Sequence, residues 1–165
     1  AVRRLGEALK IDYSVLGREW AYHGIKPCIV AEELLTDESG DDLKDYKVFC
    51  FNGEPKFIQI DYDRFKGHKR RLYTTDWNLM ETKITYPDDA DLIMPKPIFL
   101  DELLKISKKL SKDIPFLRVD CYITENQIYF GELTFYPGCG FEPITPDTDD
   151  ALWGEWLKLP EETKK

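Results

Sequence analysis

The 165-residue chain carries 31 acidic and 23 basic residues, which gives a formal net charge of −8. This balance disfavours non-specific binding to nucleic acid or to anionic membranes, because both depend on clustered positive charge. The length is typical of a single domain over residues 1–165, and a hydrophobic content of 42% is enough for a buried core. No apolar run approaches the roughly 20 residues that a membrane-spanning helix needs.

The first third of the chain predicts a helical stretch, a strand and a hairpin. Residues 1–20 contain apolar side chains at loose helical spacing. Residues 28–31 (CIVA) are typical of a strand, which runs into two carboxylates and then into an acidic loop. In residues 45–63, two β-rich runs flank Asn52-Gly53, the strongest short signal for a hairpin turn.

The middle of the chain predicts a basic segment, an irregular connection and a helix. Residues 64–75 concentrate positive charge in an otherwise acidic chain, and residues 76–97 contain three prolines and a short strand. Residues 100–112 predict an amphipathic helix with acidic residues at its start and lysines at its end, an order that complements the helix dipole. Its apolar face comprises Leu100, Leu103, Leu104, Ile106 and Leu110.

Residues 118–138 predict a second hairpin that carries charged side chains. If its turn centres near Glu125 or Asn126, Asp120 and Glu132 share one face, with β-carbons about 5 to 8 Å apart. Two carboxylates this close need a positive charge or a proton between them. They suit Mg²⁺, with Arg118 on the same face to bind a phosphate oxygen, or they form a surface ion-pair ladder. The order of elements predicts the α+β class with a mainly antiparallel sheet.

The four cysteines form no CxxC pair, and the chain has only two histidines, so a structural zinc site is not expected. Cys28, Cys50, Cys121 and Cys139 are predicted to be buried, reduced thiols of a cytoplasmic protein.

The second hairpin resembles the end of the ATP-grasp fold, where an Arg-x-Asp strand precedes a Glu-x-Asn strand and a Pro-Gly loop. Four sequence segments resemble more closely the TupA-like (teichuronopeptide-biosynthesis type) ATP-grasp family, and the resemblance covers roughly residues 15 to 160. They are DYKVFCFNGEPKFIQID, DRFKGHKRRLY, TDWN and YFGELTFYPGCGFEPITP. No Gly-rich loop precedes residue 28, so the resemblance implies the C-terminal part of the ATP-grasp fold.

The resemblance implies a ligase that uses ATP and Mg²⁺ to convert a carboxylate into an acyl phosphate, which an amine then attacks. Asp120 and Glu132 would be the Mg²⁺ ligands, with Glu132 bridging two ions. Thr134 would be the third metal ligand, at the position where Asn usually completes the shell; its hydroxyl is a weaker and shorter ligand for the second ion than an amide carbonyl. Arg118 and the backbone N–H of Gly138 would stabilise the charge that develops on the acyl phosphate.

The resemblance also implies a nucleotide site. Glu32, Glu33 and Leu35 would meet the adenine, Asp45 would bind the ribose, and Lys47 on the next strand would also contact the nucleotide. The basic segment offers Arg64, His68 and Lys69 for phosphate or a carboxylate substrate, because a local positive field attracts small anions. The same segment can equally be a strand with solvated charges.

Three functions remain open from the sequence. The first is the ligase, acting on a small carboxylate and an amine, with cell-surface polysaccharide building blocks as substrates. The second is a non-catalytic binding module derived from an ATP-grasp enzyme. The third is a carbohydrate-active hydrolase that uses Asp120 and Glu132 as acid and nucleophile. In that hydrolase the sugar platforms would be Trp20, Trp77, Trp153 and Trp156.

Overall fold

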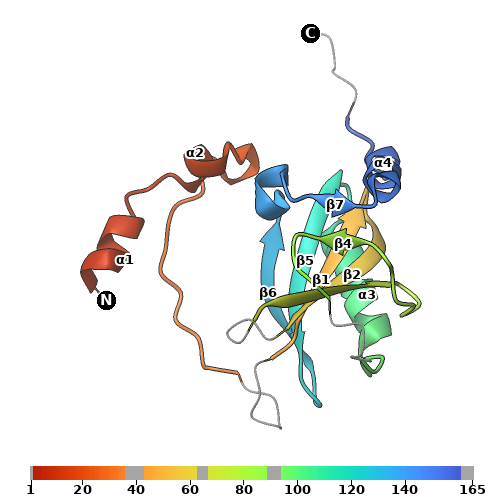
Figure 1. The fold of residues 1–165 in the computed structure, drawn as a ribbon. Coiled ribbons are helices and arrows are strands. Elements are labelled where there is room, and N and C mark those ends of the chain that lie inside the picture. The colour runs from red at the N-terminus through yellow and green to blue at the C-terminus, as the bar shows by residue number, and fades with distance from the viewer. Residues whose placement is uncertain (1, 36–42, 63–66, 89–93, 161–165) are drawn as a thin grey trace.

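The computed structural model describes residues 2–35, 43–62, 67–88 and 94–160, and its centre is a five-stranded antiparallel sheet (Figure 1). The strand order is β3-β2-β1-β5-β6, and a two-stranded β4-β7 sheet lies beside it. The strands are β1 (Asp45–Phe51), β2 (Glu54–Tyr62), β3 (Lys69–Thr74), β4 (Lys83–Ile84), β5 (Phe116–Ile123), β6 (Ile128–Thr134) and β7 (Ile144–Thr145). The predicted α+β class with a mainly antiparallel sheet is confirmed.

The hairpin predicted around Asn52-Gly53 joins β1 to β2. Both turn residues have positive φ, 50° at Asn52 and 79° at Gly53. This is the pattern of a tight two-residue turn whose twist matches the strands. The Asn52 side chain also donates a 2.7 Å hydrogen bond to the carbonyl of Trp156, which ties the turn to the C-terminal helix.

One face of the sheet packs against α3 (Leu100–Leu110). Leu100 and Leu103 are buried in a core cluster with Val48, Ile58 and Val119 of the central strands. The helix predicted at residues 100–112 is therefore confirmed, two residues shorter at its end, where Ser111 caps it.

The opposite face is divided between aromatic and charged side chains. At one end, Phe49, Phe51 and Phe57 form a second core cluster with Trp153 of α4 (Asp147–Trp156), and the rings of Phe57 and Trp153 stack at 4.2 Å. The charged residues of the strands occupy the rest of this face, so a hydrophobic layer covers only part of it.

The N-terminal segment forms α1 (Val2–Ala8), α2 (Tyr13–Gly17) and the 3₁₀ turn η1 (Trp20–Tyr22), and α1 stands apart from the sheet in Figure 1. The phenol oxygen of Tyr22 accepts a 2.8 Å hydrogen bond from the N–H of Phe135, which holds the turn beside the end of β6. None of the helices in the described ranges is long and apolar enough to cross a membrane.

Two predictions fail in these regions. The strand predicted at residues 28–31 is wrong: the segment joins no sheet, and Val30 is 70% exposed because no neighbouring strand covers it. The predicted burial of the cysteines holds for Cys50 and Cys121 but is wrong for Cys28 and Cys139, which are exposed. All four thiols are free, as expected, and burial raises the pKa of Cys50 to about 11.

Replacing Leu103 with Ala tests the packing of α3 on the sheet. The side chain is fully buried, so its loss removes apolar burial and leaves a cavity, and we expect about 2–5 kcal/mol of lost unfolding free energy. Leu110→Ala on the same helix is the control, since Leu110 is 37% exposed and should cost about 1 kcal/mol or less. Equal losses in urea unfolding would contradict this packing.

Candidate functional site

The predicted charged residues lie side by side on the partly covered face of the sheet. β1 and β5 pair so that Lys47 faces Asp120, and β5 and β6 pair so that Asp120 faces Glu132. Residues that face each other across antiparallel strands project to the same side, so the three side chains form a row across β1, β5 and β6. Asp120 and Glu132 are thus direct partners across the hairpin, which is one of the two pairings that the predicted turn positions allow.

A bulge at Gly131 interrupts the regular pairing of β6 with β5. The register shifts after Asp120, so that Cys121 pairs with Phe130 and Tyr122 with Tyr129. A Cβ at Gly131 would lie 2.9 Å from the backbone oxygen of Asp120, so only glycine fits this approach. The bulge brings β6 close to the backbone of the central acid.

The carboxylate of Asp120 is buried between two cations. It accepts hydrogen bonds from Arg118 Nε at 2.8 Å, from Arg118 Nη2 at 2.7 Å and from Lys47 Nζ at 2.6 Å. Lys47 also donates to Asp45 at 2.5 Å. Asp120 is only 2% exposed, so these partners replace the hydration that burial removes.

Arg118 connects this buried pair to the exposed part of the row. Its Nη2 lies 3.3 Å from Glu132 Oε1 and 3.1 Å from Thr134 Oγ1, and Thr134 donates to Glu132 at 3.2 Å. Burial alone would lower the pKa of Arg118, but its hydrogen bond and charge interaction with Asp120 outweigh burial and raise it. A permanent cation therefore stands between the two carboxylates.

A hollow of about 460 Å³ opens directly over Lys47 and Asp120. Glu32, Glu33 and Leu35 form one wall, and β1, β5 and β6 form the others. Seven of the residues predicted to bind nucleotide or metal line it: Glu32, Glu33, Leu35, Asp45, Lys47, Asp120 and Glu132. The fold therefore gathers three segments distant in sequence around one volume of the size typical of small-molecule sites.

A second hollow, of about 750 Å³, lies on the other side of Glu132, between β6, the turn η2 (Pro137–Gly140) and the N-terminal helices. Arg118, Glu132, Thr134 and Gly138 are among its lining residues, so it holds both predicted catalytic positions, Arg118 and Gly138, and the predicted metal position Thr134. Gly138 has φ 52°, and a Cβ there would lie 2.1 Å from Cγ of Glu142, so the turn requires glycine. Glu132 is common to both hollows.

The basic segment lies outside these two hollows. His68 and Lys69, at the start of β3, line neither of them, and Arg64 is outside the described residues. The ring of His68 instead stacks on Tyr86 at 3.9 Å, and its Nε2 lies 3.5 Å from Asp61 Oδ1. The predicted phosphate contacts of His68 and Lys69 stay predictions.

A second buried charge cluster, absent from the sequence predictions, lies beside the first. Arg70 donates to Asp61 at 2.7 and 3.2 Å and to Glu142 at 2.8 Å, and Gln59 donates to Asp61 at 3.1 Å. The alternation of β2 carries the signal, since Phe57, Gln59 and Asp61 share one face. This pattern of one buried aromatic residue followed by two polar residues fits a face that a helix covers at one end only, since Phe57 stacks on Trp153 of α4.

A model of the TupA-like ATPgrasp family matches residues 3–158. The chain belongs to the TupA-like ATP-grasp family. No curated protein and no solved structure matches it. ATP-grasp enzymes in general use ATP and Mg²⁺.

The donors in the first hollow fit Mg²⁺ bound together with phosphate. No group of three His, Cys, Asp or Glu side chains that could hold a metal alone occurs within the four described ranges. Asp120 and Glu132 supply two carboxylates, however, and Mg²⁺ is commonly bound by one or two carboxylates plus substrate phosphates. Lys47 Nζ lies 2.6 Å from Asp120 Oδ2, so a metal ion bound to Asp120 would compete with this ammonium for the carboxylate.

The Asp61–Arg70 pair predicts an acid-sensitive contribution to stability. Burial would raise the pKa of Asp61, but the hydrogen bond and charge of Arg70 outweigh burial and lower it. Since the folded-state pKa lies below the unfolded value of about 3.9, the contribution is complete above that pH and is lost as pH falls through the folded-state pKa. We therefore expect the difference in unfolding free energy between wild type and Asp61→Asn to be largest near pH 6 and to shrink below about pH 4.

Chemical denaturation at pH 3, 4, 5 and 6 measures this difference. Asp76→Asn, at an exposed position, is the control and should change stability little at any of these values. A difference for Asp61→Asn that stayed constant across the series would show that the Asp61 carboxylate is not held by Arg70.

Proposed function

We propose that this chain carries the nucleotide site of an ATP-grasp ligase that activates a carboxylate as an acyl phosphate with Mg²⁺–ATP for attack by an amine. The observation that supports this most is the first hollow, where residues 32–35, Asp45, Lys47, Asp120 and Glu132 meet. A ligand-binding role explains why acidic side chains from three separate segments converge on one volume instead of dispersing into solvent.

In this proposal the nucleotide lies along the first hollow. Glu32, Glu33 and Leu35 contact the base, and Asp45 binds the ribose. Lys47 lies between Asp45 and Asp120, so its ammonium is near the position of the phosphates, where it offsets their negative charge. Mg²⁺ held by Asp120 and Glu132 would neutralise phosphate charge and orient the terminal phosphoryl group.

Arg118 and the Pro137–Gly140 turn then belong to the transfer step. Arg118 lines the second hollow and contacts Glu132 and Thr134. Because Glu132 lines both hollows, Arg118 lies where the first and second hollows meet. A guanidinium can bind two oxygens of a phosphate or carboxylate at once. With the backbone N–H of Gly138 it would stabilise the charge on the acyl phosphate and its tetrahedral adduct with the amine. Uronic acids or amino acids of cell-surface polysaccharides are the proposed substrates.

The hydrolase alternative has less support. A general acid must present a proton to the leaving group, whereas the carboxylate of Asp120 already accepts hydrogen bonds from Arg118 and Lys47. The proposed sugar platforms are also dispersed. Trp153 is buried in an aromatic cluster, Trp77 stacks on Tyr73 at 4.4 Å, and Trp20 stacks on His23 at 4.3 Å.

Calorimetric titration with a non-hydrolysable ATP analogue tests the nucleotide site. We expect micromolar binding that requires Mg²⁺ and weakens at least tenfold in Glu132→Gln, because the variant loses one of the two carboxylates that would hold the metal. The side chain of Glu132 is 65% exposed, so this variant should keep the stability of wild type, whereas a change at the buried Asp120 should also lower the stability of the folded chain.

Glu125→Gln, at an exposed position in the turn of the same hairpin, is the matched control and should bind like wild type. The double variant Asp120→Asn/Glu132→Gln should show no Mg²⁺-dependent heat while still unfolding cooperatively. Absence of binding by wild type at millimolar nucleotide would contradict the ligase proposal and favour the non-catalytic module. Unchanged affinity in Glu132→Gln would contradict the assigned metal ligand.

A further inference from the structure

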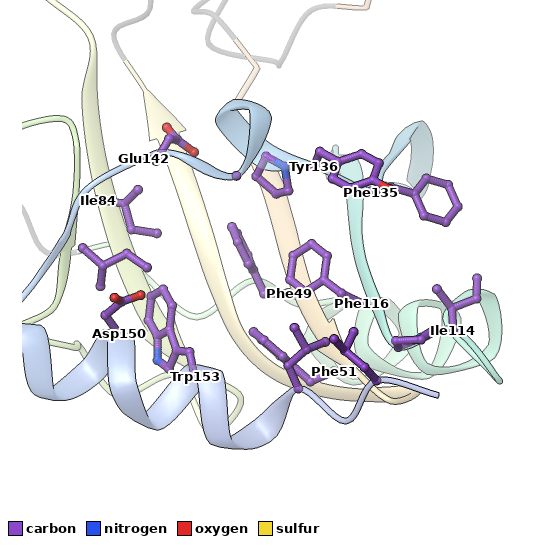
Figure 2. Close-up of a pocket in the computed structure, with 17 residues that line it drawn as sticks. Phe49, Phe51, Ile84, Ile114, Phe116, Phe135, Tyr136, Glu142, Asp150 and Trp153 are labelled. Atoms are coloured by element: carbon purple, nitrogen blue, oxygen red, sulfur yellow. The ribbon is translucent and has the colours of Figure 1, made fainter. Parts of the chain in front are cut away.

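A third hollow, with a volume of about 570 Å³, lies on the same sheet face beyond the charged row (Figure 2). Phe49, Phe51 and Phe116 of β1 and β5 form its floor, and Trp153 of α4 contributes a side wall. Most of the remaining lining is also apolar. Of the residues predicted from the sequence to bind ligand or metal, only Trp153, a sugar platform in the hydrolase alternative, lines this hollow.

The third hollow adjoins the second. Tyr136 and Pro137 line both, and Phe49 is the β1 partner of Arg118, so the two volumes lie on either side of the same turn. Glu132 in turn joins the second hollow to the first. Three hollows therefore follow one another across the sheet, from the acidic segment at residues 32–35 to α4.

Both charged residues that line the third hollow are acidic. Its lining residues include Glu142 and Asp150 but no Lys, Arg or His. In Figure 2 both carboxylates lie toward the side of the hollow where Ile84 is labelled. Glu142 is paired with Arg70 at 2.8 Å, whereas Asp150 is exposed in the first turn of α4, where the helix dipole stabilises a negative charge.

We propose that this hollow binds an apolar amine in its ammonium form, with an aromatic or aliphatic body against the phenylalanines and Trp153 and the ammonium beside Asp150 and Glu142. An apolar carboxylate or phosphate of the same size would lie beside the exposed carboxylate of Asp150, and no cationic side chain lines the hollow. A strongly polar ligand would lose hydration against the aromatic walls without gaining hydrogen bonds. This binding does not depend on the proposed function, because it requires neither nucleotide nor metal.

Gly154 offers a way to fill the hollow without touching the charged row. It lies on α4 and lines the hollow, and a Cβ built there meets nothing within 4 Å. Leucine at this position should therefore extend into the hollow, and it replaces a helix-interior glycine with a better helix former. Gly154→Leu should fold at least as well as wild type while excluding a ligand.

Nucleotide-free NMR titrations with 4-phenylbutylamine, 4-phenylbutanol and 4-phenylbutyrate test the proposal. These probes share one apolar body and differ in charge. We expect the amine to bind about tenfold more tightly than the carboxylate. Attraction between exposed carboxylates and the ammonium should raise the affinity of the amine about threefold, and repulsion should lower the affinity of the carboxylate about threefold. The alcohol should fall between them, and Gly154→Leu should abolish all three.

Asp150→Asn should reduce the preference for the amine about threefold, whereas Asp147→Asn, in the same helical turn but outside the hollow, should leave it unchanged. Equal binding of the three probes, tighter binding of the carboxylate, or full binding to Gly154→Leu would overturn the proposal. Since no nucleotide is present, these outcomes are independent of whether the first hollow binds Mg²⁺–ATP.

Discussion

The buried contact among Asp120, Arg118 and Lys47 is the interaction on which the arrangement of this face depends. A carboxylate that is 2% exposed is stable only if charged or polar groups replace its water, and here two cations do so at 2.6 to 2.8 Å. Lys47 comes from β1 and Arg118 from β5, so the contact requires the β1–β5 register and, through Arg118, positions Glu132 and Thr134 of β6. The charged row therefore has a definite geometry before any ligand arrives.

The two faces of the sheet have different roles. The face under α3 is filled by a hydrophobic cluster of aliphatic side chains and tyrosines. The opposite face carries an aromatic cluster under α4, and the charged row beside it has hollows above it. Since hydrophobic burial on this side is confined to one end, the polar end can keep buried charges next to accessible volume. That combination is typical of ligand sites and costly in a purely structural sheet.

Local signals in the sequence predicted the parts of the fold that local physics determines. The Asn52-Gly53 turn, the amphipathic helix α3 and the facing of Asp120 and Glu132 follow from turn chemistry and alternation. The strand expected at residues 28–31 failed because a β-prone segment forms a strand only where a neighbouring strand pairs with it. The bulge at Gly131 and the Asp61–Arg70 pair depend on contacts between strands, and the third hollow depends on where α4 packs. Tertiary contacts of this kind leave no fixed spacing in one sequence.

The most direct test of the account is a crystal structure of the chain with Mg²⁺ and a non-hydrolysable ATP analogue. If the row is a nucleotide site, the metal will be bound by Asp120 and Glu132, and the Lys47 ammonium will have moved from its 2.6 Å contact with Asp120 to a phosphate oxygen. A structure in which the Lys47–Asp120–Arg118 contacts persist and the nucleotide binds elsewhere would contradict the account. The buried charges would then serve only to hold β1 against β5.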